Sequence, residues 1–75
     1  MNYRYEIVHT YYGADKTHPH FGLALMECYD NEIRPLRTFA DLSLNRQDIE
    51  HLVADCNRFQ LSPIHLMDVI EDFLE

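Results

Sequence analysis

The sequence contains few of the residues that mark loops, disulfide frameworks or membrane segments. It has two glycines, three prolines, two cysteines and no tryptophan in 75 residues. So little glycine and proline argues against a loop-dominated scaffold, and two cysteines are too few for a disulfide framework. The longest apolar run, Phe21 to Met26, is six residues long, far short of the roughly 20 that a bilayer-spanning helix needs.

A secretory leader is also not indicated. The first residues lack the basic segment and apolar stretch of a signal peptide, because the alternating pattern of Tyr3 to Val8 begins at once. We therefore expect a cytoplasmic protein in which Cys28 and Cys56 stay reduced and buried.

Positive charge is scarce, above all in the second half of the chain. Residues 1–40 carry four basic and five acidic side chains, a net charge of −1, whereas residues 41–75 carry two basic and eight acidic ones, a net charge of −6. Direct nucleic-acid binding needs a basic surface, so this class of function is excluded. A charged partner is expected to be basic.

The first forty residues carry the patterns of three β-strands. Apolar and polar side chains alternate from Asn2 to Tyr11, as in a half-buried strand. Both faces are apolar from His20 to Tyr29, which predicts a strand in the middle of the sheet. Asp30-Asn31 can adopt the positive φ angles of a hairpin turn, and a third strand returns over about Glu32 to Phe39. Pro35 cannot donate to a ladder, so this strand belongs at an edge.

The remaining residues, 44–75, carry the signals of two helices. Asn45 suits the N-cap of the first helix, with Asp48 placed to complete a capping box. Ser62 as N-cap and Pro63 at the first helical position indicate the start of the second helix. The second apolar arc is wider than the first, so we expect the second helix to be the more buried, in contact with both the sheet and the first helix. Its members are Leu66, Met67, Val69, Ile70, Phe73 and Leu74.

These patterns together predict a single α+β domain over residues 1–75. A three-stranded antiparallel meander over 1–40 is followed by a two-helix hairpin over 44–75 that packs on one face of the sheet. A chain this short buries a small core, so association with a second copy or a partner is a natural source of further stability.

The main candidate for a partner-binding site is an acidic face on the second helix, opposite the apolar arc. Near His65 it gathers four carboxylates, those of Asp68, Glu71, Asp72 and Glu75. The i,i+4 pairs of like charge cost roughly 0.2–0.5 kcal/mol each, and acids in the last turn oppose the helix dipole. Three interpretations are open: a solvated face, a basic partner, or ion pairs within the fold to Arg4 or Arg37.

No motif indicates a metal, a cofactor or a catalytic centre. His18-Pro19-His20 is a compact histidine pair, but there is no C-x-x-C or H-E-x-x-H motif. Nucleophile and phosphate-loop motifs are also missing. We expect no cofactor, no metal and no enzymatic activity. An acid–base pair of His65 with Asp68 or Asp72 would need a pocket that the sequence does not show.

The tyrosines of the first strand offer a second candidate site. Tyr3, Tyr5 and Tyr11 share one face with Ile7, a pattern typical of a core face with hydroxyl groups at its rim. This strand has no proline, so its edge is predicted to be open to strand addition by a second copy or a peptide. Tyr3 and Tyr5 are therefore candidate partner-binding residues.

A resemblance to a known family is carried by the C-terminal segment Leu61-Ser62-Pro63-Ile64-His65-Leu66-Met67-Asp68-Val69-Ile70-Glu71-Asp72-Phe73-Leu74. It resembles the ending of a family of short bacterial proteins of unknown function, found mainly in Firmicutes. Phe21-Gly22-Leu23 and Leu42-Ser43 resemble the Tyr-Gly-Ile-like strand and Ile-Ser-like helix approach of that family, with Phe21 and Leu23 as conservative departures. The resemblance implies no activity, cofactor or site. It implies a shared pattern that includes Ser62, Pro63, His65, Asp68, Glu71 and Asp72.

Two functional hypotheses follow. The first is a small interaction or regulatory module that uses the acidic helix face or the edge of the first strand. The second is an acidic inhibitor that imitates nucleic acid and occupies a basic channel. Steep salt sensitivity of binding favours the imitator, whereas salt-tolerant pairing through the first strand favours the module.

Overall fold

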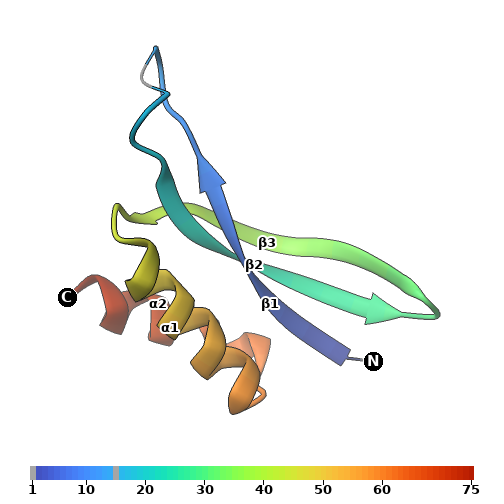
Figure 1. Ribbon diagram of the computed structural model, residues 1–75. Helices are drawn as coiled ribbons and strands as arrows, with labels where there is room; N and C mark the ends of the chain where they lie inside the picture. The colour runs from blue at the N-terminus through green and yellow to red at the C-terminus, as the bar shows by residue number, and fades with distance from the viewer. Residues whose placement is uncertain (1, 15) are drawn as a thin grey trace.

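The computed structural model describes residues 2–14 and 16–75 and shows a three-stranded antiparallel sheet followed by helices (Figure 1). The strands pair in the order β1-β2-β3, and their bounds are β1 (Asn2–Thr10), β2 (His20–Tyr29) and β3 (Glu32–Ser43). The chain then forms α1 (Arg46–Arg58), the 3₁₀ turn η1 (Pro63–His65) and α2 (Leu66–Leu74). The predicted α+β fold, a meander followed by two helices on the sheet, is confirmed.

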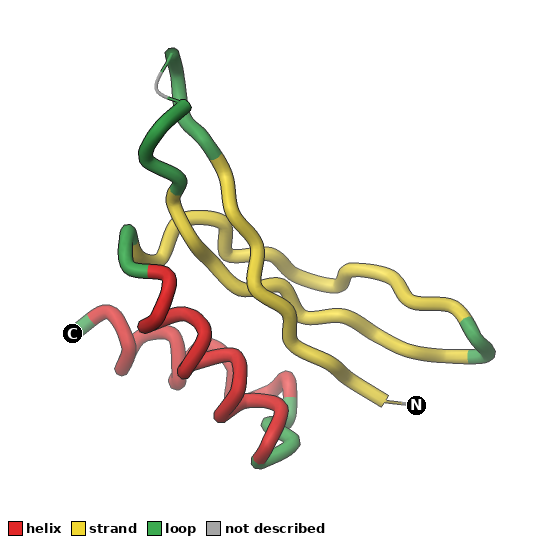
Figure 2. The backbone as a smooth tube through the Cα atoms, viewed as in Figure 1, coloured by secondary structure: helices red, strands yellow, loops and turns green. Residues whose placement is uncertain are grey.

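The helices lie together on one side of the sheet, and the β2–β3 hairpin projects beyond them (Figure 2). Of the strands, β1 is the one that α1 approaches most. The core between the two layers is formed by Tyr5, Leu23, Leu25, Cys56, Leu66 and Ile70. No helix within the described residues has the length and apolar character needed to cross a membrane.

The hairpin between β2 and β3 follows the sequence pattern at its turn. Asp30 and Asn31 both have positive φ angles, 49° and 65°, as a two-residue turn that matches the strand twist requires. The third strand continues past the predicted end at Phe39 to Ser43. Its pairing with β2 is irregular, and its last residues bend toward α1.

The pairing of β2 with β3 shifts register at two places, between Leu25 and Met26 and at Gly22. Phe21 is paired with Ser43 and Leu23 with Phe39, so three residues of β3 stand opposite the single residue Gly22. Such a bulge bends a strand and increases its twist. The backbone carbonyl of Phe39 comes so close to Gly22 that no Cβ atom fits between them.

The N-cap of the first helix is Asn45 as predicted, but the second hydrogen bond of the cap has a different partner from the predicted one. The Asn45 side chain accepts a hydrogen bond from the Gln47 backbone N–H at 2.9 Å, which satisfies one free donor of the first turn. The predicted capping box with Asp48 is wrong, because the Asn45 backbone N–H donates to the Ser43 hydroxyl at 2.9 Å. The end of β3 therefore supplies the second half of the cap.

The first helix ends without a glycine. Gln60 adopts a left-handed conformation with φ of 50°. The Leu61 N–H donates to the Cys56 carbonyl at 2.9 Å, and the Gln60 N–H donates to the Asn57 carbonyl at 3.2 Å. These two bonds form a Schellman motif. It reverses the chain so that the second helix returns beside the first.

The second helix differs from its prediction in two ways. The segment that Pro63 opens is a 3₁₀ turn, and the α-helix begins only at Leu66. Ser62 precedes this turn without a side-chain capping bond. Leu66 and Ile70 are buried in the common core as expected. Val69 and Phe73 are half-buried, whereas Met67 and Leu74 are exposed. The wide apolar arc of α2 is therefore covered only in part.

Candidate functional site

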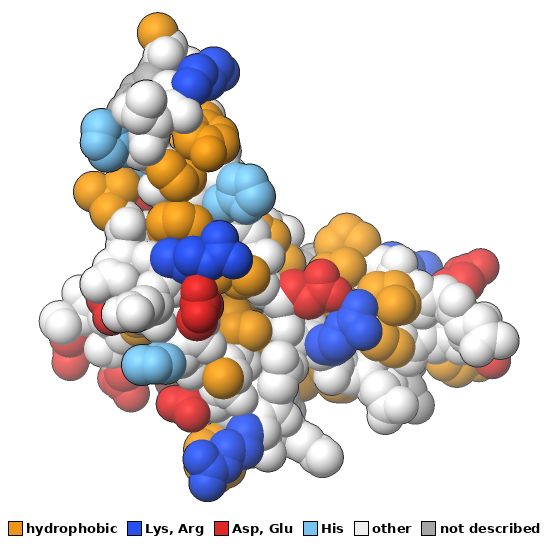
Figure 3. Space-filling view, in the orientation of Figure 1, with side chains coloured by type: hydrophobic (Ala, Val, Ile, Leu, Met, Phe, Trp, Pro, Cys, Tyr) orange, Lys and Arg blue, Asp and Glu red, His pale blue; other side chains and the backbone are white. Residues whose placement is uncertain are grey.

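The acidic residues of α2 lie on its exposed side. Asp68, Glu71, Asp72 and Glu75 are all exposed, as is His65 at the end of η1. In Figure 3, carboxylate-bearing side chains gather over the helical layer. We call this surface, formed by the outward sides of α1 and α2, the acidic helical surface. Residues 44–75 contribute seven acidic and two basic side chains to it, a net charge of −5.

The shorter α2 changes how Asp68 relates to the helix dipole. Because α2 begins at Leu66, Asp68 stands in its first turn, where a negative charge is stabilising. Glu71 and Asp72 fall in the second half of the nine-residue helix, and Glu75 is its C-cap residue. The unfavourable interaction with the dipole expected for acids in the last turn therefore applies to Glu71, Asp72 and Glu75 but not to Asp68.

The arginines are all engaged elsewhere, which bears on the proposed pairing of the acidic face within the fold. Three arginines contact carboxylates: Arg4 with Glu6 at 2.6 Å, Arg34 with Glu27 at 3.0 Å, and Arg46 with Glu50 at 2.8 Å. The other two lie over aromatic rings, Arg37 at 4.9 Å from the Phe39 centroid and Arg58 at 5.0 Å from the Phe59 centroid. Within residues 2–14 and 16–75, no ion pair joins Arg4 or Arg37 to the acids of α2, so intramolecular pairing is not what places them there.

Neutralising three of these acids should stabilise the protein. The triple variant Glu71→Gln, Asp72→Asn and Glu75→Gln removes two i,i+4 repulsions and three charges that oppose the dipole. We expect the free energy of unfolding to rise by about 1 kcal/mol at low ionic strength and the gain to shrink as salt is added. Urea denaturation at two salt concentrations measures both effects.

The control for this prediction is Asp68→Asn made in the same triple variant. It should lower the free energy of unfolding slightly, because it removes a charge that favours the first turn of α2. A triple variant that is clearly less stable than the wild type would instead show that these carboxylates have cationic partners within the fold.

A shallow apolar groove runs between α1 and α2. Its volume is about 180 Å³, and it is lined by Leu52, Asp55, Cys56, Phe59, Leu61 and Val69. Phe59, the C-cap residue of α1, is 69% exposed although it is large and apolar. Phe59 follows the buried Cys56 by three residues, yet the structure places it at the margin of this groove.

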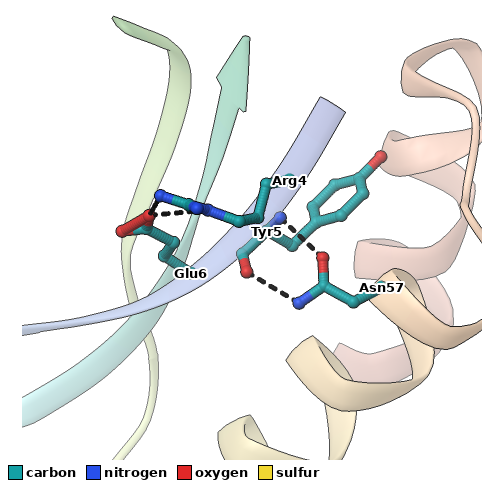
Figure 4. A network of polar contacts seen from close by, with 4 residues as sticks. All are labelled: Arg4, Tyr5, Glu6 and Asn57. Carbon is teal, nitrogen blue, oxygen red and sulfur yellow. Dashed lines mark hydrogen bonds and ion pairs between the residues drawn. The ribbon is translucent and has the colours of Figure 1, made fainter. Parts of the chain in front are cut away.

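The β1 edge is also different from its prediction. The strand lies at the edge of the sheet as expected, but it is not open at Tyr5. The Tyr5 N–H donates to Asn57 Oδ1 at 2.8 Å, and Asn57 Nδ2 donates to the Tyr5 carbonyl at 2.9 Å (Figure 4). The α1 side chain thus forms the two bonds that a neighbouring strand would form, and at this position it blocks strand addition.

The two tyrosines proposed as partner-binding residues have different environments. Tyr3 is 42% exposed, whereas Tyr5 is 2% exposed and its hydroxyl donates to the Leu61 carbonyl at 2.6 Å. Burial raises the pKa of the Tyr5 hydroxyl, with further contributions from Cys56 and Tyr3. Because the fold favours the neutral hydroxyl, Tyr5 contributes fully to the free energy of unfolding below its unfolded pKa of about 10. This contribution is lost as the pH rises through the higher folded value. Tyr5 is therefore a core residue.

The histidine pair of the β1–β2 loop does not converge on one point. His20 Nδ1 lies 2.9 Å from Asp41 Oδ1. The His20 ring packs edge-on against the Tyr12 ring, with 4.6 Å between the ring centroids. His18 Nδ1 lies 2.9 Å from the Thr17 hydroxyl. In the described part of the chain no group of three or more potential ligands is placed to hold a metal ion.

The remaining polar candidates, His65, Asp68 and Asp72, are all exposed. A hollow of about 570 Å³ lies between the start of β1 and the α1–η1 connection. Its lining contains neither His65 nor Asp68 nor Asp72. Cys28 and Cys56 are free thiols, and burial raises the pKa of Cys56, with a smaller effect of Asp55. A raised pKa leaves a thiol unreactive at neutral pH.

Comparison with known proteins places the chain in a family but assigns it no activity. The model of a family of unknown function (DUF6514) matches residues 1–75. No curated protein and no solved structure matches the chain. Because the match extends over its whole length, the protein belongs to the DUF6514 family.

Proposed function

We propose that this protein is a small interaction module that binds a basic region of another protein through its acidic helical surface. The observation that carries the proposal is that the carboxylates of α2 are exposed and have no cationic partner among residues 2–14 and 16–75, while every arginine contacts another carboxylate or an aromatic ring. Three of them also stand where the dipole and their neighbours disfavour them. A basic partner would remove that cost on binding.

Because the backbone groups of Tyr5 at the β1 edge are already bonded, binding through the acidic helical surface is favoured over strand addition. Asn57 occupies the backbone groups of Tyr5, so an added strand would have to displace part of α1. At the other edge of the sheet, Pro35 interrupts β3, and a proline blunts an edge because it lacks the N–H donor. The acidic helical surface needs no rearrangement to meet a partner.

A pair of matched charge variants tests the proposal. Asp68→Asn with Asp72→Asn removes two negative charges from α2, and Asp30→Asn with Glu32→Gln removes two from the hairpin tip. We expect the first variant to lose a partner that the wild type captures from cell extract, and the second to retain it. Equal capture by wild type and both variants would refute the proposal.

The salt dependence of the captured complex separates this function from imitation of nucleic acid. A nucleic-acid imitator depends on many phosphate-like charges, so its affinity should fall steeply with salt. The apolar groove between the helices favours an interaction module, because apolar contacts are insensitive to salt screening. We expect part of the affinity to persist at high salt.

A further inference from the structure

We infer that the groove between α1 and α2 is the docking site for a basic amphipathic helix that inserts one large apolar side chain beside Phe59. The inference rests on the proposed function and specifies its binding site and the class of its partner. Four features carry it: the apolar lining of the groove, the exposure of Phe59, the position of the acids along both rims, and the size of the hollow.

The lining of the groove is largely apolar, and its residues range from the buried Cys56 to the exposed Phe59. Five of its six residues are apolar, and they come from both helices and their connection. Phe59 projects beside it with 69% of its surface exposed. An aromatic side chain at this exposure gains free energy in proportion to the apolar area that a partner covers. Burial of such rings dominates the energy of many protein interfaces.

Asp55 is part of the groove lining, and helical spacing places further acidic side chains on both sides of the groove. On α1, Asp48, Leu52, Asp55 and Phe59 follow one another at intervals of four, three and four residues, so they share one side of the helix. On α2, Asp72 lies three residues after Val69, and Asp68 four residues before Asp72. An apolar strip with carboxylates on both margins is complementary to a helix that carries an apolar stripe between basic side chains.

The size of the groove limits what it can hold. A volume of about 180 Å³ is below the usual range of about 300–1,000 Å³ for small-molecule sites, and it suits a single apolar side chain. A second copy of this chain is disfavoured as the occupant, because its own helical layer carries a net charge of −5 and like charges would face each other.

The contact between Arg58 and Phe59 shows the kind of interaction that a basic partner would make with this ring. Its guanidinium lies 5.0 Å from the centroid of Phe59, a distance at which a cation is attracted to an aromatic face. An arginine or lysine of the docked helix would make the same kind of contact with this ring, and its apolar anchor would fill the groove beside it.

A synthetic peptide tests the inference without knowledge of the natural partner. The probe is a fluorescent helix of lysine and alanine with a leucine stripe at i, i+4 spacing, and its control is a scrambled isomer of identical composition. Fluorescence anisotropy measures the affinity of the wild type for both. We expect the amphipathic probe to bind at least about tenfold more tightly than the scrambled one.

Two variants locate the contact. Phe59→Ala should weaken binding of the amphipathic probe by about tenfold. Ile64→Ala, which removes another apolar side chain of the helical layer that is 81% exposed and outside the groove lining, should change it less than about twofold. Since Phe59 and Ile64 are both exposed, neither variant should disturb the fold, and a thermal melt verifies this.

The outcomes distinguish the inference from the proposed function. Equal binding of both peptides, unaffected by Phe59→Ala, would overturn the groove as the docking site but leave an acidic interaction surface. Failure of both peptides to bind at low salt would contradict the inference and the proposed function together.

Discussion

Replacing Gly22 with alanine should destabilise the protein by about 3 kcal/mol or prevent it from folding. A Cβ atom at this position would overlap the backbone carbonyl of Phe39 and stand 2.7 Å from the carbonyl carbon of Ala40. Backbone atoms cannot move aside as a flexible side chain can, so β3 would have to separate from the central strand. Strain of this kind lies at the upper end of the range for overpacked sites. Urea denaturation followed by circular dichroism measures the loss.

The control for this prediction is the only other glycine in the sequence. Gly13 has a φ of 62° and no atom within 4 Å of a Cβ position. Gly13→Ala should therefore cost only the roughly 1–2 kcal/mol of a left-handed alanine. If Gly22→Ala were no less stable than Gly13→Ala, the close approach of β3 to β2 would be wrong.

Asn57→Ala should cost about 1–3 kcal/mol and make the protein associate with itself. Asn57 satisfies both backbone groups of Tyr5, and each net hydrogen bond contributes roughly 0.5–1.5 kcal/mol. Its removal also leaves an unpaired donor and acceptor at the edge of the sheet, a template for another strand. Chemical denaturation measures the first effect, and sedimentation velocity measures the second.

His51→Ala provides the comparison for Asn57→Ala. His51 is an exposed residue of α1, so its replacement reports the gain in helix propensity that alanine brings at either position. Asn57→Asp retains the acceptor for the Tyr5 N–H but places a carboxylate beside the Tyr5 carbonyl, and it should also destabilise. An Asn57→Ala variant as stable and as monomeric as His51→Ala would show that Asn57 does not guard β1.

Local sequence patterns were sufficient for the elements of the fold. The two-residue turn at Asp30-Asn31 and the N-cap at Asn45 depend on residues that are adjacent in the chain, so their physical signals can be read directly. The central position of β2 followed from its apolar character on both faces. These features were predicted because the interactions that create them span only a few residues.

The features that were missed depend on segments far apart in the chain. Asn57 bonds to Tyr5 across 52 residues, and nothing in the local pattern of α1 distinguishes it from a solvated polar residue. The role of Gly22 depends on the path of β3, although a glycine within a strand is a known signal for close backbone approach. The 3₁₀ turn after Pro63 moved the start of α2, and with it the relation of Asp68 to the dipole.

Only the part of the candidate site that depends on local spacing was predicted from the sequence. The acidic residues of α2 were identified from helical spacing within one element, and the structure places all four on the exposed side. The groove beside them could not be predicted, because Leu52, Phe59 and Val69 meet only when the Schellman motif at Gln60 sets the angle between the helices. Spacing along one helix shows which residues share a face, but it does not show where the faces of two helices meet.

The most direct test of the account is to map the binding surface on the protein by NMR. Addition of the purified natural partner to isotope-labelled protein should shift the amide signals of residues beside the groove, among them Leu52, Asp55, Phe59 and Val69. The signals of β1 and of the hairpin tip at Asp30 should stay in place. Shifts confined to β1 or β3, with the helices unchanged, would contradict the acidic helical surface as the site of interaction.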